Sequence, residues 1–183
     1  MRTIYTSTDM ETPFIKYIAN TQHYDDVLAR VAFVKHTLWI GTADIKDVYV
    51  KSGTSVIPLL AVFDKLVKKN VAIRLIHAKE PGPIFREEHE KFPALWSSME
   101  MTLCPRVHFK LMIFDMETAY IGSANLTGAG IGMKSVQKRN FEAGILTNEP
   151  SLVDAAINQF DEVWRGRYCE KCGRKNYCND QIR

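Results

Sequence analysis

Six residues of one short apolar segment form a motif, and four of them have side chains that can act on a phosphate. They follow the pattern His-x-Lys-x4-Asp-x6-Gly-Ser-x-Asn and are His108, Lys110, Asp115, Gly122, Ser123 and Asn125. We expect Val107 to Phe114 to form an apolar strand, residues 115–118 its turn, and residues 119–121 an antiparallel return strand. Because residues two apart share a strand face, His108 and Lys110 should point the same way. This hairpin would gather an imidazole, an ammonium, an amide and a hydroxyl at one end.

These four groups fit the chemistry of a phosphodiester. Lys110 would place a compact positive charge against the non-bridging oxygens, and Asn125 and Ser123 would supply neutral donors. A neutral imidazole is nucleophilic near neutral pH, so His108 can attack the phosphorus. Its other ring nitrogen must then be held. Glu142, on the next expected strand, is the candidate because a carboxylate fixes the tautomer and stabilises the charged ring.

The pattern resembles the HKD motif of the phospholipase D superfamily, without a gap from His108 to Asn125. The resemblance implies that His108 forms a phosphohistidine, that Lys110 and Asn125 bind the phosphoryl group, and that Ser123 supports them. It also implies that Asp115 braces the hairpin without touching substrate, and that Glu142 orients His108. A histidine nucleophile needs no metal-activated water, so we expect no catalytic metal.

Enzymes of this superfamily use two such motifs, the second histidine protonating the leaving group. His77-Ala-Lys79 has the first two motif residues, but Ile84 stands where the Asp is required, and no Gly-Ser-x-Asn follows. One complete motif resembles the single-motif nucleases, which form homodimers. A two-fold interface would bring two copies of His108 together. The alternative is a degenerate copy of the motif kept for binding alone.

Hydrophobic periodicity predicts an α/β fold, a mixed sheet flanked by helices that resembles one half of the phospholipase D fold. We expect helices over residues 23–35, 55–69 and 150–165, and strands over residues 37–43, 71–76, 99–104, 107–114, 119–121 and 141–146. Residues 80–98 should be a loop with one or two helical turns. The strand, helix, strand order over residues 37–76 predicts a parallel crossover unit.

A cysteine-rich tail follows this domain. We place the catalytic domain at residues 1–166 and the tail at residues 167–183. Cys169-Glu-Lys-Cys172-Gly173 is typical of a zinc knuckle, and Cys178 offers a third thiolate. The last helix should return the chain towards Cys104, which makes Cys104 the expected fourth ligand of a structural zinc ion, with His89 as the alternative. Free thiols or a redox pair would also account for the cluster.

Composition and charge narrow the functional class. The chain has 183 residues, 46% hydrophobic and 25% charged, as in an ordinary globular protein. It has no apolar run long enough to span a membrane and no signal peptide, so we expect a cytoplasmic protein. Residues 165–183 carry six basic side chains and two acidic ones. This excess of positive charge indicates either a solvated tail or a surface that binds a polyanion.

Nucleic acid is therefore the expected partner. Basic side chains near the motif that could contact its phosphates are Arg106, Lys134, Lys138 and Arg139, and Tyr168 and Tyr177 could stack on bases. The sequence predicts a metal-independent phosphodiesterase, an endonuclease acting as a homodimer. The alternatives are a phospholipase D-type lipid hydrolase or transferase, and a non-catalytic module that binds nucleic acid.

Overall fold

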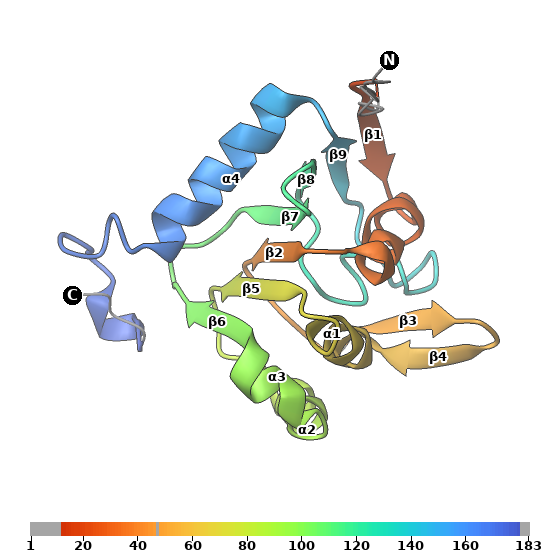
Figure 1. The fold of residues 1–183 in the computed structure, drawn as a ribbon, viewed down its shortest axis with the longest axis horizontal. Coiled ribbons are helices and arrows are strands. Elements are labelled where there is room, and N and C mark those ends of the chain that lie inside the picture. The colour runs from red at the N-terminus through yellow and green to blue at the C-terminus, as the bar shows by residue number, and fades with distance from the viewer. Residues whose placement is uncertain (1–11, 47, 180–183) are drawn as a thin grey trace, which may run out of the picture.

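A seven-stranded mixed sheet forms the centre of the molecule (Figure 1). The computed structural model describes residues 12–46 and 48–179. The strands lie in the order β1-β9-β8-β7-β2-β5-β6. Their bounds are β1 Ile15–Ala19, β2 Thr37–Thr42, β5 Ala72–His77, β6 Met99–Leu103, β7 Lys110–Phe114, β8 Thr118–Gly122 and β9 Ala143–Thr147. The fold class is therefore the one that the sequence predicted, a mixed α/β sheet.

The sheet has a parallel half and an antiparallel half. Strand β5 pairs in parallel with both β2 and β6, which confirms the expected parallel crossover over residues 37–76. Strand β7 pairs antiparallel with β2, and β8, β9 and β1 continue the antiparallel order. The carboxyl ends of β2, β5 and β8 therefore lie next to the amino ends of β7 and β9, at the same end of the sheet.

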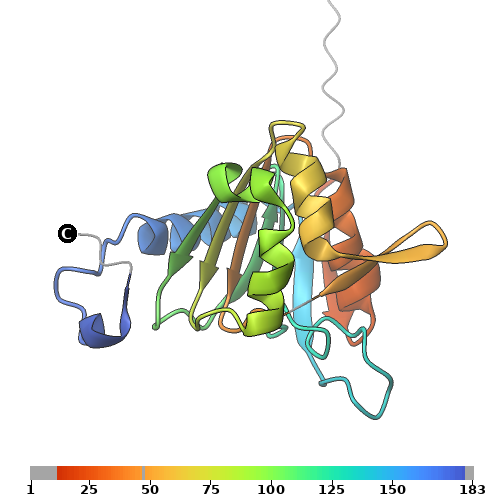
Figure 2. The same ribbon diagram turned by 90° about the horizontal axis from the view of Figure 1, so that it is seen from below.

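Helices cover both faces (Figures 1 and 2). Helix α4 (Pro150–Trp164) packs on one face through Val153, Ala156 and Phe160. On the other face lie α1 (Leu59–Val67), α3 (Pro93–Ser98) and two short helical segments, η1 (His23–Val27) and η2 (Leu28–Phe33). Helix α2 (Pro83–Glu90) contacts α3. Two hydrophobic clusters result, one on each side of the sheet.

Three expected elements differ from the structure. Residues 23–33 are helical, but as a π-helical turn followed by a 3₁₀ helix. The helix expected over residues 55–69 begins only at Leu59, because β4 (Ser55–Pro58) forms a hairpin with β3 (Tyr49–Ser52). Gly53, with a φ of +60°, makes the turn of this hairpin, and proline at residue 58 stands just before the helix. Residues 80–98 contain the two helices α2 and α3 instead of a loop with one or two helical turns.

The tail beyond α4 lies beside the edge strand β6 (Figure 1). Among residues 165–179, the one regular element is the short η3 (Lys175–Tyr177). In Figure 2 the tail and the loop that joins β8 to β9 project from opposite sides of the sheet. No helix in the described part of the chain is long and apolar enough to cross a membrane.

Candidate active site

The side chains of His108 and Lys110 meet at the start of β7. Lys110 is 6% exposed, and its Nζ atom lies 3.3 Å from Nδ1 and 3.4 Å from Nε2 of His108. The ammonium is thus about equally close to both ring nitrogens. Nζ also donates to the carbonyl oxygen of His108, at 2.7 Å.

The expectation that His108 lies within the strand is wrong. Strand β7 begins at Lys110, and exposed His108 belongs to the preceding loop. Phe109 positions this loop, because its ring lies against Gly41 of β2: a Cβ atom added at Gly41 would come within 2.2 Å of the ring. Because Gly41 has no side chain, the Phe109 ring can pack directly on the sheet, and this packing also positions the backbone of the adjacent His108.

Burial and a nearby carboxylate act in opposite directions on Lys110. Desolvation lowers the pKa of its ammonium below the ordinary 10.5, and the charge of Glu142 raises it in part. A partly desolvated cation attracts an anion more strongly than one in water. Lys110 is therefore suited to hold a phosphoryl oxygen next to His108.

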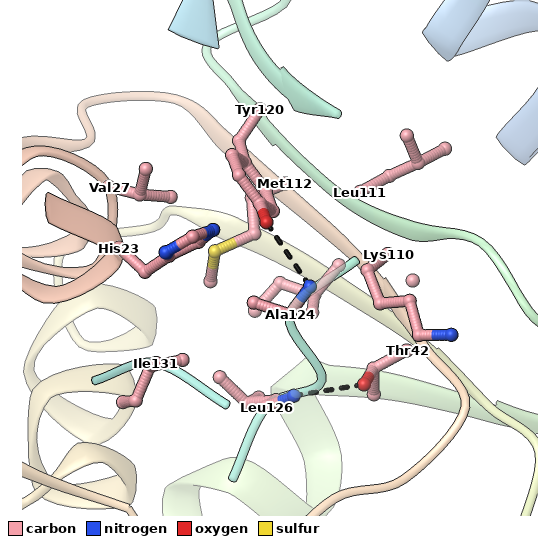
Figure 3. A pocket seen from close by; sticks show the side chains of 12 residues that line it. His23, Val27, Thr42, Lys110, Leu111, Met112, Tyr120, Ala124, Leu126 and Ile131 are labelled. Carbon is pink, nitrogen blue, oxygen red and sulfur yellow. Dashed lines mark hydrogen bonds between the residues drawn. The ribbon is translucent and has the colours of Figure 1, made fainter. Parts of the chain in front are cut away.

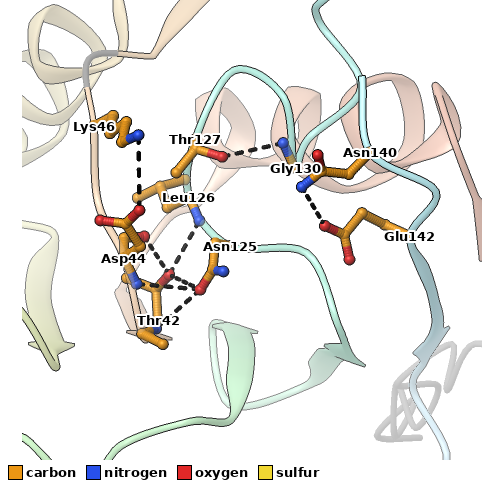
Figure 4. A network of polar contacts seen from close by, with 10 residues as sticks. Thr42, Asp44, Lys46, Asn125, Leu126, Thr127, Gly130, Asn140 and Glu142 are labelled. Atoms are coloured by element: carbon orange, nitrogen blue, oxygen red, sulfur yellow. Dashed lines mark hydrogen bonds and ion pairs between the residues drawn. The ribbon is translucent and has the colours of Figure 1, made fainter. Parts of the chain in front are cut away.

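Asn125 is held with its amide in one orientation (Figure 4). Its Oδ1 atom accepts from the backbone N–H groups of Ala43 and Asp44, both at 3.1 Å, and lies 3.3 Å from the hydroxyl of Thr42. Thr42 in turn accepts from the N–H of Leu126 at 3.0 Å. Because these donors engage the oxygen, the amide nitrogen Nδ2 faces away from them and is placed as a donor for a ligand.

Ser123 and Glu142 bind each other. The Ser123 hydroxyl donates to one carboxylate oxygen of Glu142 and accepts from the N–H of Ala143 at 3.1 Å. The other carboxylate oxygen accepts from Asn140 at 3.0 Å (Figure 4). Glu142 lies just before β9 and not within a strand, where it was expected. In the described part of the chain, its carboxylate accepts hydrogen bonds from Ser123 and Asn140 and not from His108. Its charge reaches Lys110 instead.

Asp115 braces the hairpin from its far end. Its carboxylate accepts from the backbone N–H groups of Lys35, His36 and Thr37, at 2.7–3.2 Å. Burial alone would raise the pKa of Asp115, but these hydrogen bonds outweigh it and hold the pKa below the ordinary 3.8. Asp115 and Met116 both have positive φ, as a tight two-residue turn requires, and Asp tolerates that conformation. Asp115 therefore ties β7 to β2.

A small cavity lies beneath Lys110 (Figure 3). His23 and Tyr120 line it, with ring centroids 5.5 Å apart, edge to face. Burial lowers the pKa of His23 and raises that of Tyr120 to about 12. Both rings are therefore neutral near neutral pH. The Tyr120 hydroxyl accepts from the N–H of Ala124 at 3.3 Å, and this contact supports the segment that carries Ser123 and Asn125.

Sequence reasoning missed three of these supporting residues, Thr42, His23 and Tyr120. The one sequence signal that could have indicated any of them was the polar Thr42 at the end of an apolar strand. His23 and Tyr120 are brought to the site by packing between distant segments, and nothing in their local sequence indicates it.

The expected basic residues lie on two sides of the site. Exposed Lys134 and Lys138 and half-buried Arg139 are on the loop between β8 and β9, which begins next to Asn125 and ends at Glu142. Arg106 is exposed two residues before His108, and its guanidinium lies 3.9 Å from the sulfur of Cys172 in the tail. The site is therefore flanked by positive charge from the loop and from the tail side.

The cysteines expected to bind zinc converge on one corner. Cys104, Cys169 and Cys172 line a cavity of about 280 Å³, and the thiol of Cys178 donates to the carbonyl of Leu103 at 3.5 Å. Cys104, Cys169 and Cys172 are free thiols. Within residues 12–46 and 48–179, no three His, Cys, Asp or Glu side chains are close enough to share an ion as they stand. His89, the alternative ligand, does not line this cavity.

The fold and the motif define a phospholipase D-like domain, and the comparisons agree. Residues 34–164 match the family model described as "Cardiolipin synthase, PLD-like domain". Because this match spans most of the chain, the protein belongs to that family and to the phospholipase D superfamily. No curated protein gives a significant match to the sequence.

Three solved structures share the fold. NucT from Helicobacter pylori superposes with a TM-score of 0.61 at 10% identity, covering 84% of this chain and 96% of that one. Nuc from Salmonella typhimurium, described as a phospholipase D family member, gives 0.59 at 15% identity, with 84% and 95% covered. TrmBL2, described as an archaeal chromatin protein with a novel mode of DNA binding, gives 0.54 at 12% identity, with 86% and 54% covered.

Proposed function

We propose that this protein is a metal-independent phosphodiesterase that cleaves nucleic acid through a phosphohistidine on His108. The observation that carries the proposal is the ammonium of Lys110 beside the imidazole of His108, 3.3 Å and 3.4 Å from its two nitrogens. A cation in that place can hold a phosphoryl oxygen while the in-plane lone pair of the ring meets the phosphorus. Asn125 Nδ2 supplies a second donor.

The reaction would proceed in two displacements. In the first, a ring nitrogen of His108 forms a bond to phosphorus, and the bond to the leaving oxygen breaks as that oxygen takes a proton from an acid. In the second, a water that has lost its proton to the same group attacks phosphorus and releases His108. Both displacements need a second acid–base group. Ser123, through Glu142, holds the backbone beside Asn125 and acts as a positioning residue.

A second copy of the chain would supply that acid as its own His108. The loop between β8 and β9 carries exposed apolar side chains, with Val136 65% and Phe141 92% exposed. Large apolar side chains exposed beside a site favour an interface. Since this loop begins next to Asn125 and ends at Glu142, a two-fold contact through it would bring the two motifs together.

Nucleic acid is the substrate class that the charges favour. Lys134 and Lys138 on the loop and Arg106 on the tail side flank the motif, as a polyanion with several phosphates would require. The DNA binding described for TrmBL2, which shares the fold, supports the same class. The free thiols suit the reducing cytoplasm, which we propose as its location. Residues 167–183 would then be a basic appendage of the catalytic domain.

The family description favours a second candidate, transfer or hydrolysis of phospholipid head groups. The shared motif binds only the phosphodiester, and the exposed Phe141 and Val136 could instead contact lipid. The two candidates differ in the substrate that turns over.

The experiment is incubation of the purified protein with labelled single- and double-stranded DNA, RNA and anionic phospholipid vesicles, in excess chelator. We expect cleavage of nucleic acid that is lost in His108→Ala. His36→Ala is the matched control, because His36 is exposed at the opposite edge of the sheet. Phospholipid turnover alone would favour the second candidate. Binding without cleavage, unchanged in His108→Ala, would identify a non-catalytic module.

A further inference from the structure

The burial pattern of the tail follows its cysteines. In residues 165–179 no side chain is fully buried. The half-buried positions of this segment are Gly166, Cys169, Cys172 and Cys178, and all the others are exposed. A segment that buries so little apolar surface lacks a hydrophobic core of its own. Its cysteines are the residues that face the rest of the protein.

These cysteines face the turn that contains Cys104. Cys169 and Cys172 line the same cavity as Cys104, and Cys178 reaches the carbonyl of Leu103, the residue directly before it. The Cys104 backbone is itself fixed, since its N–H donates to the His77 carbonyl at 2.8 Å. Two tail cysteines thus share a cavity with Cys104, and the third contacts the residue directly before it.

Two hydrogen bonds fix the backbone around Cys172. The N–H of Cys172 donates to the carbonyl of Cys169 at 3.1 Å, which closes a tight turn. The N–H of Arg174 then donates to the sulfur of Cys172 at 3.4 Å. Gly173 stands between them, and a Cβ atom there would meet nothing within 4 Å. An N–H group directed at a sulfur stabilises a thiolate, the form in which cysteine binds metals.

We propose that Cys104, Cys169, Cys172 and Cys178 bind one zinc ion, which fastens the tail to the turn before His108. Four thiolates make the closed tetrahedral site in which zinc is structural, with each sulfur about 2.3 Å from the ion. The described side chains are not this close as they stand, so the tail must close onto Cys104. Because none of its side chains is buried, that movement disrupts no core packing.

Zinc binding would release the thiol protons, and Cys178 would turn from the Leu103 carbonyl to the ion. One of its ligands, Cys104, lies four residues before His108 in the chain, and the ion would lie beside Arg106. It would hold the basic tail next to the active site without taking part in the reaction. The proposal is independent of what the active site hydrolyses.

The test measures metal content in the full-length protein, purified under reducing conditions without a metal-affinity column. We expect about one zinc per chain by elemental analysis. Separate Cys104→Ser, Cys169→Ser, Cys172→Ser and Cys178→Ser variants should each lose most of it. Glu170→Ala, an exposed change between two of the ligands, is the matched control and should keep it.

A second measurement does not depend on variants that could fail to fold. Wild-type protein reconstituted with cobalt should show the charge-transfer absorption of thiolate ligands. Its four cysteines should resist a thiol reagent until a strong chelator is added. Absence of both zinc and the cobalt absorption would overturn the proposal. Full zinc content in Cys104→Ser would remove the link to the catalytic domain, and that outcome would also overturn it as stated.

Discussion

The Lys110 ammonium lies 3.3 Å and 3.4 Å from the two ring nitrogens of His108 and donates to the same residue's carbonyl oxygen, at 2.7 Å. In the proposed reaction, this one side chain would supply charge to the phosphate and also fix the backbone of the nucleophile. Because β7 begins at Lys110, the first residue of this strand positions His108 in the loop just before it. Removing this amine should affect both roles together.

Replacing Lys110 with Met keeps most of the side-chain volume and removes the charge. We expect kcat to fall by about 10²–10³ or more, since a preorganised cation is lost from the transition state. Steady-state kinetics on a phosphodiester substrate measures the effect. Lys46→Met is the control, because Lys46 is exposed near Asp44 at the same edge of the sheet. Equal activity in the two variants would contradict the role of Lys110.

Asn125→Asp tests the orientation of the amide. The substituted carboxylate can still accept from the Ala43 and Asp44 N–H groups, so the loop should stay in place. The donor Nδ2 becomes an oxygen that repels phosphate, and we expect kcat to fall by about 10²–10³. Thermal unfolding should change little. A variant that lost its fold and its activity together would show instead that Asn125 is mainly structural.

Asp115→Asn should destabilise the protein, because Asp115 braces the hairpin and does not contact the substrate. The folded pKa of Asp115 lies below the ordinary 3.8, so its contribution to stability is full above that value and is lost as pH falls through the folded pKa. We expect a cost of about 1–2 kcal/mol near neutral pH, reduced by solvent exposure. The difference from wild type should shrink in acid. Glu117→Gln, an exposed change nearby, should have no such effect.

Gly41→Ala tests the seat of Phe109. The added methyl group would come within 2.2 Å of the Phe109 ring and must displace it, together with the adjacent His108. A misplacement of about 1 Å can cost about 10²-fold in rate. We expect kcat to fall while circular dichroism stays native. Gly82→Ala, where a Cβ atom would meet nothing within 4 Å, should retain full activity.

The sequence predicted the elements whose signals are local. The motif spacing places the β7–β8 turn correctly, and Lys110 pairs with Gly122 in the resulting hairpin. It did not predict that His108 leaves the strand, because that depends on how Phe109 packs against Gly41 of another strand. The amphipathic pattern of residues 55–69 also continues through Pro58, although the first four residues pair with β3.

The Ser123–Glu142 contact depends on tertiary register. It requires that β8 and β9 pair with Gly122 opposite Gly144, across a loop whose path no local pattern defines. Gly122 itself permits this approach, since a Cβ atom there would come within 2.8 Å of the backbone carbonyl oxygen of Ala143 on β9. Residue types and spacing therefore suggested the candidate site residues, whereas the contacts that support them arise from packing between segments.

The last prediction concerns the second copy of the chain. The two-step reaction needs a nucleophile and an acid, and the chain has one complete motif. If two subunits share each site, one imidazole must be neutral to attack and the other protonated to assist departure. Loss of either imidazole would therefore remove one of the two roles at that site.

Mixed dimers test this sharing directly. His108→Ala chains, co-expressed in excess with wild type under a different tag, should form mixed dimers that lack either nucleophile or acid. Activity should then fall roughly as the square of the wild-type fraction, whereas the same excess of His36→Ala chains should depress nothing. A fall only in proportion to the wild-type fraction, or a monomer active at full rate, would place the acid within the same chain. His77, 5% exposed at the end of β5, would then be the first residue to substitute.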